Sequence, residues 1–305
     1  MQTAAVTLRI ALSNILVATD FSDVSRAALP FALELARWYG GKIFVTRIVP
    51  YEPYLSVPLE PIPVDLDMSW NREKQSLAEF ASADIFGDVD HEEILQRGEL
   101  GEGISDLIEK KRIDVAVVGS HGRHGVKKLV LGSGAETIYR QAACPVLTVG
   151  PEAAQCCGER WQLRQILFPT DFSQTSLHAL PYAVSLAEEN QATLIFLHAA
   201  PLVPGEYPAV PFGYKESMEL HVRKRLEPLI PAEPWYQPEF LVNFDFPAPA
   251  ITRVAKERKI DLIVMGVGKP AVAALKSHLP WSIASDVVGA APCPVLTVRQ
   301  EGMAR

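Results

Sequence analysis

The segment Gly119–Gly134, GSHGRHGVKKLVLGSG, has residue types and a spacing that suit phosphate binding. Glycines at 119, 122 and 132 are followed by the hydroxyl of Ser133. The apolar run before the segment predicts a buried parallel strand, and residues 133–142 predict a helix. A helix start attracts anions, and glycines let the backbone approach them closely. The alternative is that the glycines only form turns.

Charged side chains in this segment have two interpretations each. Arg123, Lys127 and Lys128 could contact phosphate or serve as exposed loop charges. His121 and His124 could act as hydrogen-bond donors, or as acid–base groups if a carboxylate partner were present. No such partner is identifiable in the sequence, so no catalytic residue is predicted.

The segment TDFS, residues 19–22, holds a second pair of polar side chains directly after an apolar run. Asp20 and Ser22 are of the types that cap helix starts. Ligands of doubly wound sheets bind outside the carboxyl ends of strands, and Asp20 and Gly119 both lie at such ends. We interpret Asp20 as a ligand-related residue and Ser22 as a helix cap.

The chain repeats itself. Residues 15–36 recur at 166–187 with a shift of 151 and 13 of 22 positions identical, and CPVLTV at 144–149 returns at 293–298. A period of this size indicates a duplicated domain, because solenoid repeats run about 20–50 residues. The predicted domains are residues 1–150 and 165–305. The polar stretch between them, residues 151–164, is predicted to be a linker.

Apolar runs and helical patterns alternate in both copies, which predicts two tandem doubly wound open parallel five-stranded sheets of an α/β, Rossmann-like class. The strands expected in the first copy are 14–19, 42–49, 91–96, 114–119 and 145–149, and the helices are 23–39, 69–85, 102–112 and 133–142. The strands expected in the second copy are 165–169, 192–199, 238–243, 260–266 and 294–298, and the helices are 174–190, 214–229, 249–259 and 282–289.

Composition narrows the function classes. The formal net charge of −7 provides no basic field for nucleic acid or for an anionic membrane surface. No apolar stretch reaches the roughly 18 residues of a membrane span, and residues 1–14 lack a signal-peptide pattern, so we expect a cytoplasmic protein. The four cysteines do not form a disulfide framework. Cys144 and Cys293 are predicted to be core residues, and the adjacent Cys156 and Cys157 are predicted to be incidental, with redox or metal roles as the alternative.

A proline-rich stretch follows the second strand of each copy: Pro50–Asp65 in the first and Pro201–Gly213 in the second. Long connections in compact domains are often lids or disordered segments. Both interpretations stay open, and the apolar content of the stretches favours packing slightly.

TDFS, the pattern GxxG followed by nine residues and Gly-Ser, and the closing CPVLTV together resemble the universal stress protein family. The resemblance occurs once in each copy, and the two copies together make up almost the whole chain. It implies that the first copy binds ATP, with magnesium only through the triphosphate and no metal ligands of its own. The positions that match the family's binding residues are Ala18, Thr19, Asp20, Ile48, Gly119, His121, Gly122, Arg123, Gly132, Ser133 and Gly134.

The resemblance also implies a role for each part. The glycines and Ser133 would hold the phosphates, Asp20 would lie near the ribose, and the backbone of Ile48 would meet the base. Arg47 precedes Ile48 where the second copy has His198. The last strands of the two copies would pair as an intramolecular pseudo-dimer, and a homo-dimer is a further possibility.

The second copy departs from the pattern. Lys269 stands where the second glycine is expected, and Trp281 replaces the glycine before Ser282. We expect the indole to occupy phosphate space, which leaves a degenerate site that could still take a nucleoside-like ligand or a small anion. Two other function classes stay open: a slow ATPase or phosphotransferase, and a scaffold that binds no nucleotide.

Overall fold

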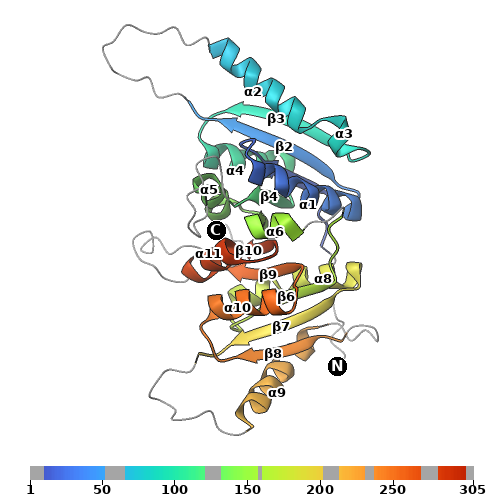
Figure 1. Cartoon of the computed structure of the whole chain (residues 1–305), viewed down its shortest axis with the longest axis vertical. Helices are drawn as coiled ribbons and strands as arrows, with labels where there is room; N and C mark the ends of the chain where they lie inside the picture. The colour runs from blue at the N-terminus through green and yellow to red at the C-terminus, as the bar shows by residue number, and fades with distance from the viewer. Residues whose placement is uncertain are drawn as a thin grey trace, which may run out of the picture. The chain divides into compact units, whose positions relative to one another are not determined.

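The computed structural model describes residues 10–51, 66–120, 132–156, 160–201, 213–230, 237–268 and 281–299 (Figure 1). These residues form two compact units. The first unit holds residues 12–120 and 132–146. The second unit holds residues 10–11 and the described residues from 147 to 299.

The elements of the first sequence copy follow the predicted order. Its strands are β1 (Asn14–Ala18), β2 (Lys42–Val49), β3 (His91–Arg97), β4 (Val115–Gly119) and β5 (Val146–Val149). Its helices are α1 (Asp23–Tyr39), α2 (Leu66–Phe80), α3 (Ala83–Phe86), α4 (Leu100–Lys111) and α5 (Ser133–Gln141). The single helix predicted over 69–85 is divided between α2 and α3, because a new turn begins at Ser82, whose carbonyl accepts from Phe86 N.

The second copy repeats this order. Its strands are β6 (Gln165–Pro169), β7 (Thr193–Ala199), β8 (Glu239–Asn243), β9 (Leu262–Val267) and β10 (Val295–Arg299). Its helices are α7 (Gln174–His178), α8 (Leu180–Asn190), α9 (Tyr214–Leu226), the 3₁₀ turn Glu227–Leu229, α10 (Pro247–Glu257) and α11 (Trp281–Ala290). The helix predicted over 174–190 is interrupted at Ala179, where the backbone tightens: Ala179 N donates to the carbonyl of Ser176, three residues earlier.

The pairing of the strands decides which strand ends lie side by side and can form a site. In the first unit β1 pairs in parallel with β2 on one side and β4 on the other. In the second unit β6 pairs in parallel with β7 and β9. The crossover direction therefore reverses beside β1 and beside β6, which is the topological switch point where doubly wound sheets bind ligands.

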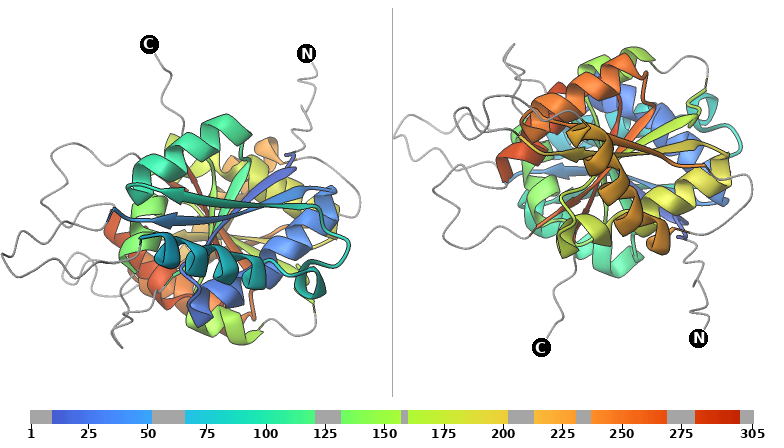
Figure 2. Two further views of the ribbon diagram at one scale, coloured as in Figure 1. Left: turned by 90° about the horizontal axis from the view of Figure 1, so that it is seen from above. Right: turned by 90° about the horizontal axis from the view of Figure 1, so that it is seen from below.

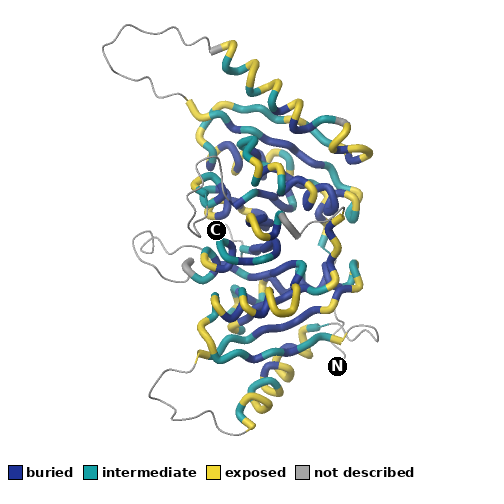
Figure 3. The backbone as a smooth tube through the Cα atoms, in the orientation of Figure 1, coloured by how far each residue is buried: buried dark blue, intermediate teal, exposed yellow. Residues whose placement is uncertain are grey.

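Helices cover both faces of the sheet in each copy. In the first copy α4 lies on one face, and α1 and α2 lie on the other (Figure 2). Buried residues run along the strands (Figure 3), and the central residues 15–17 of β1 and 115–117 of β4 are fully buried. Burial on both faces explains why these strands are continuous apolar runs without polar alternation.

The closing strands of the two copies are neighbours. Residues 147–149 of β5 belong to the second unit. In that unit β5 is the hydrogen-bonded neighbour of β10. The predicted adjacency of the two CPVLTV segments is confirmed.

The stretch predicted to be an irregular linker contains a short helix, α6 (Pro151–Cys156). The stretch is also anchored: Trp161 is buried and donates from Nε1 to the carbonyl of Asp261 at 3.3 Å. The Asp261 carboxylate accepts from the backbone N–H of Arg164 at 2.8 Å. Sequence periodicity missed α6 because six residues are fewer than two helical turns.

Cys144 and Cys293 are both buried, and neither forms a disulfide. This confirms their predicted place in the core. Desolvation by burial raises the pKa of the Cys144 thiol to about 12, so the reactive thiolate is scarce at neutral pH.

We expect the native protein to protect both of these thiols. In a Cys156→Ser/Cys157→Ser background, a thiol reagent at pH 8 is expected to react with neither Cys144 nor Cys293 until the chain is unfolded in urea, when both react. Labelling followed by mass spectrometry measures this. Fast labelling of Cys144 in the native protein would contradict its burial.

Glu92 on β3 is held between two lysines. Its carboxylate accepts from Lys111 Nζ at 2.6 Å and lies 3.5 Å from Lys42 Nζ. The hydrogen bond from Lys111 is the main reason why the pKa of Glu92 is lowered from 4.5. The ionised form is therefore favoured in the folded state.

Replacing Glu92 by glutamine is expected to lower the free energy of unfolding at pH 7 by less than about 1 kcal/mol, the usual size for a partly exposed ion pair. A lowered folded pKa contributes stability above the unfolded pKa, and this contribution is lost as the pH falls through the folded pKa. The difference from the wild type should therefore vanish in acid. Urea titrations at several pH values measure it, with Glu93→Gln as the control, since neighbouring residues of a strand face opposite sides.

Candidate functional site

The structure brings the predicted site residues to the switch-point edge of the first unit. Asp20 follows the end of β1, Gly119 is the last residue of β4, and Gly132 precedes α5. Ser133 is the first residue of that helix, as predicted. His121, Gly122 and Arg123 lie outside the described residues.

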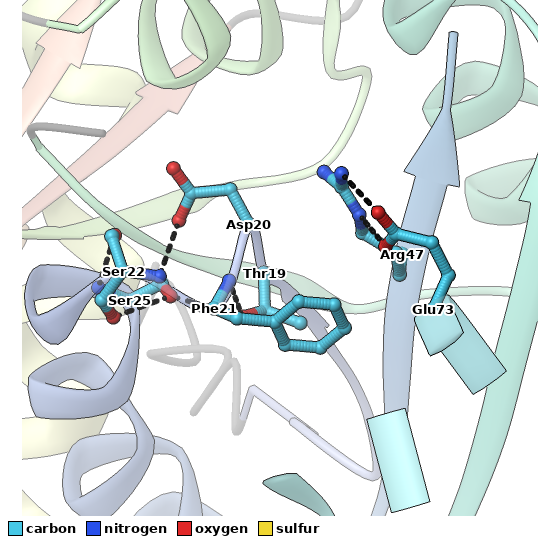
Figure 4. A network of polar contacts seen from close by, with 7 residues as sticks. All are labelled: Thr19, Asp20, Phe21, Ser22, Ser25, Arg47 and Glu73. Atoms are coloured by element: carbon cyan, nitrogen blue, oxygen red, sulfur yellow. Dashed lines mark hydrogen bonds and ion pairs between the residues drawn. The ribbon is translucent and has the colours of Figure 1, made fainter. Parts of the chain in front are cut away.

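The loop after β1 is tied together by its own side chains (Figure 4). The Thr19 hydroxyl accepts from Phe21 N at 2.9 Å and shares a hydrogen bond of 2.9 Å with the Ser25 hydroxyl. Asp20 Oδ1 accepts from Ser22 N at 3.0 Å. The Ser22 hydroxyl accepts from Ser25 N at 3.3 Å, which confirms Ser22 as the N-cap of α1.

The second copy builds the same network. Thr170 Oγ1 accepts from Phe172 N at 3.0 Å, Asp171 Oδ1 accepts from Ser173 N at 2.9 Å, and Ser173 caps α7 by accepting from Ser176 N at 3.1 Å. Burial raises the pKa of Asp171, but hydrogen bonds from Ser173 and Ser176 outweigh it, so the pKa is lowered overall. The loop geometry is therefore a property of the fold in both copies.

Gly119 has a structural reason to be glycine. A Cβ there would lie 2.7 Å from the carbonyl oxygen of Val24, so α1 packs directly on the end of β4. In the second copy a Cβ on Gly266 would collide with the carbonyl oxygen of Thr175 and lie 2.7 Å from Ser176 Cα. Both strand-end glycines permit close helix packing, which neither the phosphate nor the turn interpretation anticipated.

Gly132 closes the base of the glycine segment. Its amide donates to the carbonyl of Ser120 at 2.6 Å, and its backbone is extended, with φ −61° and ψ 147°. It therefore does not need the left-handed freedom of glycine. The first-turn amides of α5, including those of Ser133 and Gly134, follow directly, and such amides have no partner within a helix.

The two residues at the end of β2 face opposite sides of the sheet. Ile48 is buried, and its Cδ1 occupies the space in which a Cβ on Gly103 of α4 would lie. Arg47 points toward α2, where its Nε donates to Glu73 Oε2 at 2.8 Å and its Nη2 to Glu73 Oε1 at 3.3 Å (Figure 4). Any base contact by Ile48 would therefore be made by its backbone.

Sequence reasoning missed the ion pair of Arg47 and Glu73. The repeat comparison did single out position 47, where the copies differ. Nothing in the sequence indicates Glu73 as the partner, because the register of α2 on the sheet is decided by packing.

The second copy's altered loop is only partly described. Trp281 begins α11, close to the predicted start at 282, and Lys269 lies outside the described residues. Among the residues that the structure describes, no group of three histidine, cysteine or acidic side chains could hold a metal ion. No described helix is long and apolar enough to cross a membrane.

The geometry defines a class: a tandem doubly wound α/β protein with a polar switch-point edge in each copy. The sequence profile described as the universal stress protein family matches residues 12–150 and again residues 162–299. The chain belongs to the universal stress protein family and contains two such domains in tandem.

Two of the curated relatives match this chain over about the length of one copy. A universal stress protein of Methanocaldococcus jannaschii is 31% identical over 145 residues, which cover 45% of this chain and 81% of that protein. Universal stress protein A homolog 1 of Coxiella burnetii is 32% identical over 140 residues, covering 45% of this chain and 94% of that protein.

A solved structure matches both copies at once. The crystal structure of a universal stress protein from Archaeoglobus fulgidus aligns with a TM-score of 0.70 and 20% sequence identity. The alignment covers 94% of this chain and 98% of that one. At this identity the match shows the fold alone.

Alanine at either strand-end glycine is expected to destabilise the protein. Gly119→Ala and Gly266→Ala should each lower the free energy of unfolding by about 1–3 kcal/mol, because the added methyl displaces helix backbone. Gly134→Ala is the matched control, since a Cβ there meets only Leu100 Cδ2 at 3.4 Å, an ordinary contact. Denaturant titrations compare the three. Equal stability of Gly119→Ala and Gly134→Ala would contradict the packing role of Gly119.

Proposed function

We propose that this protein binds ATP at the switch-point edge of its first copy and that the second copy is a degenerate partner. The observation that carries the proposal is the convergence of Asp20, Gly119 and the start of α5 at one edge of the sheet. Carboxylate acceptors and helix-start amides at one edge are what a ribose and a phosphate chain require.

The residues at this edge have suitable chemistry for the parts of a nucleotide. Phosphate oxygens accept hydrogen bonds, and the amides and hydroxyl at Ser133 and Gly134 supply donors. The absence of a side chain at Gly132 keeps the approach to those donors open. Asp20 supplies an acceptor for a ribose hydroxyl. Magnesium would be carried by the triphosphate, since the proposal includes no protein ligands for it.

The base and loop contacts are carried over from the family resemblance. The backbone of Ile48 would meet adenine, and the end of β1 at Ala18 and Thr19 would line the nucleoside. The loop residues His121, Gly122 and Arg123 would complete the phosphate site.

The two copies differ where phosphate would bind. Gly132 precedes α5, whereas α11 begins at Trp281. A bulky residue at the helix start removes the close approach on which phosphate binding by amides depends. We infer one competent site per chain, with the second copy contributing the neighbouring strand β10 in an intramolecular pseudo-dimer. The cytoplasmic location and a further homo-dimer stay predictions from composition and resemblance.

Binding is preferred to catalysis because the sequence shows no Walker or kinase signature and no carboxylate placed to orient an attacking water. The slow-ATPase alternative is tested by release of labelled phosphate. Turnover that persists in purified protein and is lost in Gly132→Trp would favour it. A protein that neither copurifies with nor binds nucleotide would favour the scaffold alternative.

Calorimetric titration with Mg·ATP is expected to give one site per chain in the wild type. Gly132→Trp, which copies the second-copy residue, should abolish binding, and Ser133→Ala should weaken it about tenfold or more, the loss expected for one hydrogen bond to a charged group.

Trp281→Gly is the matched control in the second copy and should leave the affinity of the first site unchanged. Thermal melting verifies that each variant is folded. Two sites of similar affinity in the wild type, or no bound nucleotide at all, would overturn the proposal.

A further inference from the structure

The backbone of Phe21 is held in an unfavourable conformation beside the candidate site. Its φ is 63°, in the left-handed region that residues with a side chain rarely adopt. Phe21 follows Asp20, so the conformation of Phe21 sets the direction of the loop that carries the Asp20 carboxylate. Strained residues of this kind persist only where their surroundings hold them in place.

Side chains from two other elements hold the Phe21 ring. The Phe80 ring of α2 lies 6.0 Å from it between centroids, and the Arg47 guanidinium of β2 lies 5.5 Å from its centre. Arg47 is itself held by both carboxylate oxygens of Glu73, also on α2. The Arg47 and Glu73 side chains are only 17% and 23% exposed, so solvent screens this pair less than an exposed one.

The second copy meets the same requirement with different residues. Phe172 has φ 61°, and its ring is contacted by the His198 ring of β7 at 5.0 Å and by the Arg225 guanidinium of α9 at 4.0 Å. A cation thus lies against the loop phenylalanine in both copies, but it comes from the strand in one and from the helix in the other. A contact built twice from different residues indicates that the ring has to be held.

The two arginines that lie against these phenylalanine rings also differ in their ion pairing. In the first copy Arg47 is paired with an acid on α2, whereas among the described residues Arg225 takes part in no ion pair. A second arginine attaches α2 to the same edge: Arg97, the last residue of β3, lies 4.7 Å from the centre of the Trp70 ring. Trp70 and Glu73 are one turn apart, so α2 is docked on the ends of β2 and β3 through one face.

We propose that Arg47 is a positioning residue of the first-copy site: locked by Glu73 and stacked on Phe21, it couples the docking of α2 to the conformation of the Asp20 loop. The coupling to nucleotide rests on the proposed function. Because coupling between two equilibria is reciprocal, a ligand that needs the ordered loop also strengthens the docking of α2.

Hydrogen exchange in the protein without nucleotide tests the positioning role by itself. The amides of Phe21 and Ser22 donate to Thr19 Oγ1 and Asp20 Oδ1, so their exchange reports the loop directly. Arg47→Met and Glu73→Gln are each expected to speed this exchange about tenfold, with little change at the β4 amides of residues 115–117. Arg47→Lys, which keeps the charge but loses the planar fork, should be intermediate.

Mg·ATP is the probe for the coupling. In the wild type it should slow exchange across residues 70–80 of α2, and in Arg47→Met and Glu73→Gln this slowing should be lost while the Kd rises about tenfold, within the usual range for coupled sites. The double variant should be no worse than Arg47→Met alone, because Glu73 acts on the loop only through Arg47. Asp106→Asn is the matched control: it breaks an exposed ion pair with Lys110 on α4 and should change neither readout.

The outcomes separate the two proposals. If the wild type does not bind Mg·ATP, the proposed function and the coupling to nucleotide both fall, while the exchange of Phe21 and Ser22 still decides whether Arg47 positions the loop. If ATP binds but the variants leave both the Kd and this exchange unchanged, the role of Arg47 is wrong and the proposed function stands. Faster exchange throughout the first unit, β4 included, would show a general loss of stability and would also overturn the positioning role.

Discussion

The parallel pairing of β1 with β2 on one side and β4 on the other is the constraint on which the first copy depends. Because the central residues of β1 are buried on both faces, the polar side chains at this edge of the sheet come after the strand ends, at Thr19 and Asp20. The same pairing brings Gly119, at the end of β4, to the same edge. The second copy repeats the arrangement around β6.

The duplication separates what the fold requires from what a ligand would require. The hydroxyl and carboxylate network after the first strand is built alike in both copies, although only one copy has the glycine segment intact. Gly119 and Gly266 are likewise shared, and both permit a helix to pack on a strand end. Among the described residues, the differences between the copies that bear on the proposed site lie at the start of α5 and α11 and at positions 47 and 198.

The two copies also differ in how helices α2 and α9 contact the loop after the first strand. Each helix contacts the phenylalanine of its own copy that has a left-handed backbone conformation, through Phe80 in α2 and through Arg225 in α9. In the first copy the helix also neutralises the strand arginine through Glu73. The environment of the Asp20 loop thus depends on an element that follows it by more than forty residues in the sequence.

Periodicity and the internal repeat by themselves determined the order of the elements, the two tandem α/β copies and the residues at the strand ends, because the central strands, which are buried on both faces, are apolar runs. They missed α6 and the breaks at Ser82 and Ala179, which depend on local hydrogen bonds. Only the tertiary structure decided that Gly119 serves helix packing and that Arg47 pairs with Glu73. These contacts join segments distant in sequence, and their register is set by how side chains fill the space between helix and sheet.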